Sequence, residues 1–145
     1  MITVNEVMNT DLITISEDTT ISDAKMIMTD KNIRHIPVIK DENILIGLIT
    51  QRDILKAESA KLDRNELGEI VSPVSEMMAS NLSFVYPEDS LRTAGKAIQK
   101  HKFGCMPVVE GKQLVGILTD SDFVDVAIDL IEQMDIQEDE YAEDF

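Results

Sequence analysis

An internal repeat constrains the fold of this 145-residue chain more than any other feature of its sequence. When the chain is aligned with itself at an offset of 70 residues, and of 69 after one residue is lost, identical residues coincide along most of its length. The two halves are therefore expected to fold alike. The identical pairs are Glu6 and Glu76, Met8 and Met78, Leu12 and Leu82, Ala24 and Ala94, Pro37 and Pro107, Val38 and Val108, Leu45 and Leu114, Gly47 and Gly116, Thr50 and Thr119, and Asp53 and Asp122.

Each half is predicted to contain the same series of elements, because apolar residues follow strand and helix spacing in the same order. The first half is expected to form strands at 12–15, 36–39 and 44–49, with helices at 20–31 and from residue 50. The second is expected to form strands at 82–85, 106–109 and 114–118, with helices at 90–101 and from residue 119.

A single β-α-β-β-α unit cannot cover its own sheet, so the two units are expected to pair across a pseudo-twofold axis. The predicted fold class is α/β, of the α+β kind, with tandem β-α-β-β-α repeats whose small sheets pack against helices. We place repeat 1 at 1–57, a linker at 58–73, repeat 2 at 74–130, and a helix end with an acidic tail at 131–145.

The net charge of −15 is concentrated at the C-terminus. From Asp120 onward there are eleven acidic residues and no Lys or Arg, whereas the rest of the chain carries 17 acids and 13 bases. This balance disfavours binding to nucleic acid or to an anionic membrane. The chain has no membrane-length apolar run and its start does not resemble a signal peptide, so we expect a cytoplasmic protein.

Two segments in which a strand runs directly into a helix have residues suited to ligand binding. They contain Thr50 and Asp53 in the first half, and Thr119 and Asp122 in the second. A Thr followed three residues later by Asp is typical of a helix cap and needs no ligand to explain it. The same position also offers free backbone N–H groups, a hydroxyl, and a carboxylate that can accept from both hydroxyls of a ribose. Both interpretations remain open.

These segments, together with 35–38 and 106–109, resemble the CBS domain family, named after cystathionine β-synthase. The similarity covers 7–56 and 74–123. The resemblance implies a tandem pair, or Bateman module, which is not an enzyme, has no cofactor, and binds AMP, ADP, ATP or S-adenosylmethionine as a regulatory ligand between its repeats. It also implies a homodimer that regulates another protein, which the sequence does not identify.

The resemblance also assigns roles to individual residues. It makes Asp53 and Asp122 the ribose ligands, and Thr50 and Thr119 contacts to phosphate or ribose. Arg34 and His35 match basic positions that contact phosphate. The segments expected to line the adenine pockets contribute Thr10, Leu12, Ile36 and Pro37 from repeat 1, and Ser80, Leu82, Met106 and Pro107 from repeat 2.

The second repeat departs from this pattern at its basic positions. Gly104 and Cys105 stand where Arg34 and His35 stand in the first repeat, and Ser121 stands in place of an arginine. We therefore expect one strong phosphate site and one that is weaker or empty.

The last helix is predicted to continue beyond its counterpart in the first repeat. Val124, Ala127, Ile128, Ile131 and Met134 follow helical spacing, so this face either covers its own sheet or contributes to a homodimer. The segment 137–145 has five acids and two aromatics, which favours a disordered, solubilising tail or, alternatively, docking to a basic partner.

The leading hypothesis from the sequence is thus a ligand sensor. A ligand-independent dimerisation or interaction module is the alternative. An enzyme of nucleotide metabolism comes third, because no acid–base or metal constellation accompanies the repeats.

Overall fold

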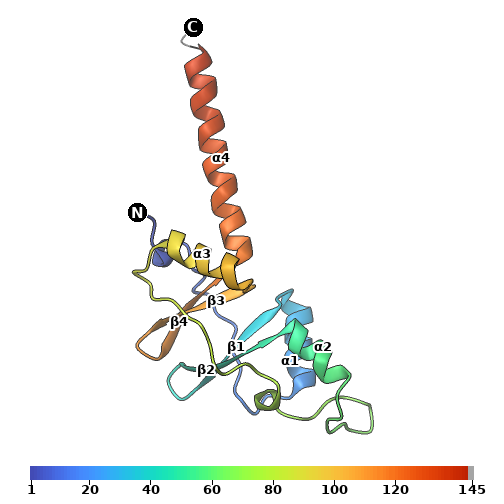
Figure 1. The fold of residues 1–145 in the computed structure, drawn as a ribbon. Helices are drawn as coiled ribbons and strands as arrows, with labels where there is room; N and C mark the ends of the chain where they lie inside the picture. Colours follow the sequence, from blue (N-terminus) through green and yellow to red (C-terminus); the bar gives the residue numbers. More distant parts are fainter. Residues whose placement is uncertain (144–145) are drawn as a thin grey trace.

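The structure, a computed structural model, describes residues 1–143 and contains two similar halves and one long projecting helix (Figure 1). In the first half, η1 (Val4–Glu6) precedes α1 (Ile21–Lys31), β1 (His35–Lys40), β2 (Ile44–Thr50) and α2 (Gln51–Glu58). In the second half, η2 (Val74–Glu76) precedes α3 (Leu91–His101), β3 (Cys105–Glu110), β4 (Gln113–Thr119) and α4 (Asp120–Glu143).

Two antiparallel hairpins meet in one four-stranded sheet of order β1-β2-β4-β3. The hairpins have equivalent bulges, at Val38/Ile39 and at Val108/Val109, which supports the pseudo-twofold relation. The inner strands are paired only at Ile44 and Gln113. The sheet therefore opens away from this single contact and leaves space between the repeats.

The strands predicted at 12–15 and 82–85 are wrong. Each segment makes only one parallel bridge, Ile15 with Val38 and Val85 with Val108. The backbone N–H of Ile15 donates to Pro37 at 3.1 Å, and its carbonyl accepts from Ile39 at 2.9 Å. The residues before each bridge run across the space between the hairpins instead of along a strand, so they form no ladder.

The N-terminal segment of each repeat packs on the core of the other repeat. Val4 is fully buried in the second core with Val85, Leu118 and their neighbours. Val74 is fully buried in the first core beside Ile36 and Ile49. Each repeat thus completes its apolar core with a segment that precedes the other repeat in the chain.

Glycines in the inner strands allow this exchange. A Cβ on Gly116 would lie 2.5 Å from the Sδ atom of Met8, and a Cβ on Gly47 would collide with the Sδ atom of Met78. Because neither glycine has a side chain, the two methionines lie directly on the strands, Met8 on β4 and Met78 on β2. This arrangement ties the repeats into one body.

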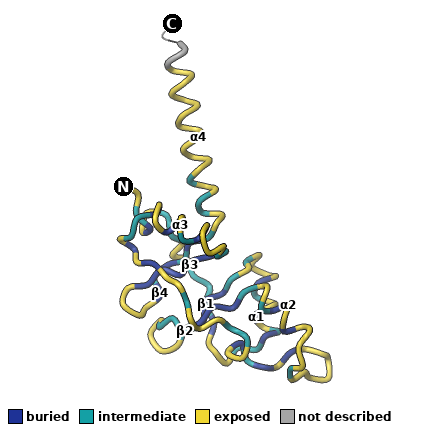
Figure 2. The backbone as a smooth tube through the Cα atoms, in the orientation of Figure 1, coloured by how far each residue is buried: buried dark blue, intermediate teal, exposed yellow. Residues whose placement is uncertain are grey.

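Helix α4 extends far beyond the body to which its first turns belong (Figures 1 and 2). Phe123 and Val126 pack against the second core, but every residue from 127 to 140 is exposed. Its 24 residues span about 36 Å at 1.5 Å per residue. The helix continues to Glu143, so the expectation of a disordered tail from 137 is wrong over that range, while residues 144 and 145 lie outside the described part of the chain. None of the helices in residues 1–143 is long and apolar enough to cross a bilayer.

Candidate ligand-binding cleft

A cavity of about 1140 Å³ lies between the two repeats, where the sheet opens. Both repeats contribute equivalent parts to its wall: the ends of the inner strands, the first turns of α2 and α4, and the crossing segments 9–13 and 79–83. Ligand pockets commonly have volumes of about 300–1000 Å³. The cleft therefore has room for a ligand of nucleotide size, and for more than one small ligand.

Each Thr–Asp pair forms the helix cap expected from the sequence. The carboxylate of Asp53 accepts from the backbone N–H of Thr50 at 2.9 Å and from its hydroxyl at 3.0 Å. The carboxylate of Asp122 accepts from the N–H of Thr119 at 2.8 Å and from its hydroxyl at 3.2 Å. In both pairs the Oδ2 atom makes these bonds, so one carboxylate oxygen per helix is already occupied.

The predicted site residues divide between the cleft wall and the protein interior or surface. Strand alternation explains part of the division, because Pro37 and Pro107 face the cleft while Ile36 and Met106 point into the two cores and are buried. The predicted residues in the wall are Leu12, Arg34, His35, Pro37, Thr50, Leu82, Pro107 and Thr119. Those that do not line it are Thr10, Ile36, Asp53, Ser80, Met106 and Asp122.

Several wall residues were missed by the sequence interpretation. Gln51 and Asp120 directly follow the two capping threonines, so the repeat alignment itself could have indicated them. Asn9 and Ser83 had no such signal, because they lie just outside the segments 10–12 and 80–82 that were expected to line the adenine pockets. The missed polar residues in the wall are Asn9, Asn32, Gln51, Ser83 and Asp120, and the wall also includes Asp11 and Asn81 from the expected segments together with Arg52, Lys102 and Ser121.

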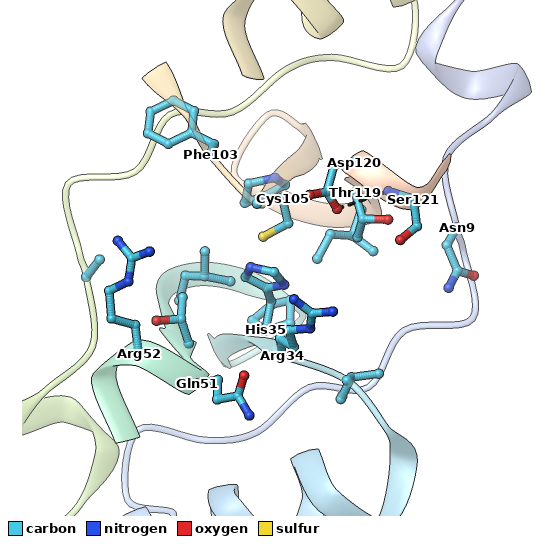
Figure 3. A pocket seen from close by; sticks show the side chains of 18 of the residues that line it. Asn9, Arg34, His35, Gln51, Arg52, Phe103, Cys105, Thr119, Asp120 and Ser121 are labelled. Carbon is cyan, nitrogen blue, oxygen red and sulfur yellow. Dashed lines mark hydrogen bonds between the residues drawn. The ribbon is translucent and has the colours of Figure 1, made fainter. Parts of the chain in front are cut away.

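The side chain of His35 reaches from the first repeat onto the second (Figure 3). A Cβ on Gly104 would lie only 2.6 Å from the Nε2 atom of His35, so the imidazole occupies space that the missing side chain leaves free. Burial lowers the pKa of His35, the carboxylate of Asp120 raises it, and Arg34 lowers it again. The net effect is a pKa below the ordinary value of 6.5, which keeps this imidazole neutral at pH 7.

Cys105 lies beside this contact on the opposite wall (Figure 3). Burial, and to a smaller degree the charge of Asp120, raises the pKa of its thiol to about 12. The thiol is therefore neutral and unreactive at physiological pH. Within residues 1–143, no group of three or more His, Cys, Asp or Glu side chains has the arrangement needed to hold a metal ion.

The family model for the CBS domain matches this chain twice, at residues 4–60 and 74–129. The chain belongs to the CBS domain family. The two matches coincide with the two structural halves that enclose the cleft. CBS domains are regulatory modules and not catalytic ones.

Known CBS proteins resemble this chain over most of its length. The CBS domain-containing protein YhcV of Bacillus subtilis is 32% identical over 118 residues, which cover 81% of this chain and 80% of YhcV. The crystal structure of AcuB from Vibrio cholerae aligns with a TM-score of 0.83 and 38% identity, covering 93% of this chain and 96% of that one. CBSX2, solved in complex with AMP, aligns with a TM-score of 0.76 and 27% identity, covering 88% and 97%.

Some curated relatives are much longer than this chain. It spans 41% of a protein from Methanocaldococcus jannaschii and 20% of a homoserine O-acetyltransferase from Methanosarcina acetivorans. What the CBS pair shares with those proteins is therefore one part of their length.

Proposed function

We propose that this CBS pair is a regulatory module that binds an adenine nucleotide or another adenosyl ligand in the cleft between its repeats. The observation that carries the proposal is the cavity itself, which is walled by the first turns of two equivalent helices, one from each repeat. Free backbone N–H groups at helix N-termini favour phosphate, and the threonine hydroxyls add polar contacts. The relative CBSX2 was solved with AMP, which supports the same ligand class here.

The apolar parts of the wall suit an adenine ring. Leu12 and Pro37 on one side, and Leu82 and Pro107 on the other, occupy equivalent positions around the cleft. Backbone groups of the crossing segments lie next to these side chains, because each segment passes from an inner strand of one repeat to the outer strand of the other. A flat, apolar base with polar edges fits such a wall.

Calorimetry and thermal unfolding with AMP, ADP, ATP and S-adenosylmethionine test this proposal. A ligand at about 100 times its dissociation constant should stabilise the fold by about 2.7 kcal/mol. Thr50→Val removes a hydroxyl from the wall and should weaken binding, whereas Thr93→Val on the exposed surface of α3 should not. If no adenosyl compound binds, the sensor proposal fails and a ligand-independent interaction module becomes the better explanation.

Asp53 needs a separate variant because it already caps α2. Asp53→Ala should lower the free energy of unfolding by about 0.5–2 kcal/mol even without ligand, since the cap is lost. Asp53→Asn keeps an oxygen that can accept from the Thr50 N–H. If Asp53→Asn folds as the wild type but binds nucleotide weakly, the carboxylate has a role in binding beyond the cap.

We also propose that a second copy of this chain covers the exposed face of α4. Four large apolar residues in helical spacing lie on this face: Val124, Ile128, Ile131 and Met134. Between 47% and 61% of each is exposed. Two α4 helices would repel each other, because residues 120–143 include acids and no base. The exposed face of α2 is complementary, with Leu55 between Arg52 and Lys56.

This assembly gives the module a way to transmit ligand binding. Leu55 and Val124 occupy equivalent positions on α2 and α4, and both also line the cleft. A ligand at the helix N-termini would therefore touch the same two helices that contact the second copy. Ligand-dependent change in assembly, or in the face offered to a regulated protein, follows from that shared position.

A further inference from the structure

The two walls of the cleft have opposite charges at structurally equivalent positions. On the first wall the backbone N–H of Gln51 donates to the carbonyl of Arg34 at 2.9 Å, and Arg52 follows in the chain. On the second wall the N–H of Asp120 donates to the carbonyl of Gly104 at 3.4 Å, and Ser121 follows. These hydrogen bonds show that Arg34 is equivalent to Gly104 and Gln51 to Asp120, so that Arg52 is equivalent to Ser121. The first wall therefore has two guanidinium groups there, and the second has a carboxylate and no base.

The other charged residues of the cleft do not reverse this difference. Lys102 lines the cavity near the second wall, at the C-cap of α3. Asp11 also lines it, two residues after Asn9, which pairs with Ile117 of β4, so this side of the cleft contains one further base and one further acid. His35 reaches the second wall at Gly104, but burial keeps its imidazole neutral at pH 7. The second wall therefore has the carboxylates of Asp11 and Asp120 and the ammonium group of Lys102, whereas the first wall has two guanidinium groups.

The charges select for different ligand groups. Guanidinium groups bind phosphate with two parallel hydrogen bonds, so Arg34 and Arg52 suit a nucleoside phosphate. A carboxylate beside the phosphate position of the second wall repels a phosphate and attracts a cation. The cavity of about 1140 Å³ has room for both ligands.

We infer that the cleft contains two subsites that sort adenosine ligands by the charge of their 5′ group: the wall of Arg34 and Arg52 binds a 5′-phosphate, and the wall of Asp120 binds a neutral or cationic 5′ group. This inference rests on the proposed function. It names Asp120 as the residue that determines specificity in the second subsite, and it predicts two ligands of different charge bound together.

Three probes that share the adenine and the ribose but differ in the charge of the 5′ group test it: AMP, adenosine, and 5′-amino-5′-deoxyadenosine, which carries an ammonium group. Calorimetry should find one AMP per chain, and saturating AMP should not displace the amino compound. Asp120→Asn should weaken the amino compound about tenfold and leave AMP at the first wall unchanged. Arg34→Gln should weaken AMP about tenfold and leave the amino compound unchanged.

The controls are Asp129→Asn on α4 and Arg92→Gln on α3, which are exposed residues outside the cleft wall and should alter neither affinity. The inference is overturned if AMP and the amino compound compete for one position, or if Asp120→Asn changes both affinities equally. Those outcomes leave nucleotide binding itself intact. If none of the three probes binds to the wild type, the proposed function fails together with this inference.

Discussion

The imidazole of His35 lies on the backbone of Gly104, so a side chain of the first repeat fills the space of a missing side chain in the second. We expect Gly104→Ala to displace the ring, because a new Cβ would lie 2.6 Å from Nε2 and 2.9 Å from Cε1. The ring is at the end of a rotatable side chain, so the cost should be near the low end of overpacking, about 1 kcal/mol. Urea unfolding measures this cost, and NMR of the imidazole reports the displacement. In a His35→Ala background, Gly104→Ala should cost much less; an equal cost in both backgrounds would contradict the contact.

The same histidine predicts a pH dependence of stability. Its pKa is below the ordinary value of 6.5 mainly because the ring is buried. As the pH falls below about 6.5 the unfolded chain binds a proton at His35, whereas the folded chain binds it only at lower pH. This residue therefore contributes a free energy of unfolding that decreases as the pH falls through that window. His35→Gln should show a shallower decrease, measured by urea unfolding at about pH 7.5, 6.5 and 5.5. An identical pH profile in the two proteins would show that the imidazole is not held neutral.

The exchanged N-terminal segments predict that the inner-strand glycines are sensitive to substitution. Gly47→Ala should destabilise the fold by about 1–3 kcal/mol, because the new methyl group meets both the Met78 side chain and the carbonyl of Ala79. Thermal and urea unfolding measure the loss. Shortening the methionine by Met78→Ala should recover part of it. If Gly47→Ala is as stable as the wild type, η2 does not pack on the first repeat as the structure shows.

Much of the fold could be predicted because the two repeats show the same apolar spacing in the same order. The helix expected at 20–31 is α1 at Ile21–Lys31, and the strand expected at 36–39 is the centre of β1 at His35–Lys40. The strands expected at 12–15 and 82–85 failed, since alternation of apolar residues does not show whether a partner strand runs alongside. The packing of η1 on the second repeat and of η2 on the first could not be predicted either. Met8 and Met78 are equivalent in sequence, but equivalence does not say on which repeat each residue packs.

The cleft was predictable only in outline. The capping threonines were identified, because a cap is a local pattern, and both line the cavity. The carboxylates of Asp53 and Asp122 accept hydrogen bonds from the capping threonines. The spacing of Thr and Asp in the sequence does not show whether the carboxylate caps the helix or binds a ligand. Asp120 was overlooked because its effect depends on the opposite wall. Its significance appears only when Gly104 and Arg34 are seen at equivalent positions in one cavity.

The projecting helix predicts a change of assembly without a change of fold. Ile128, Ile131 and Met134 are exposed and lie beyond the turns of α4 that pack on the body, so replacing all three with Gln should leave the stability of a single chain unaltered. The same triple variant should dissociate the proposed dimer to a 16.2 kDa monomer, because the apolar face is lost. Sedimentation velocity over a range of concentrations measures this.

Ile136→Gln is the matched control, since Ile136 is equally exposed but lies outside the row in helical spacing. Lys56→Glu should also weaken the dimer, because α4 would then meet an acidic surface on α2. A wild type that stays monomeric at every concentration would rule out the second copy as the occupant of this face and leave it to a regulated protein with a basic docking segment.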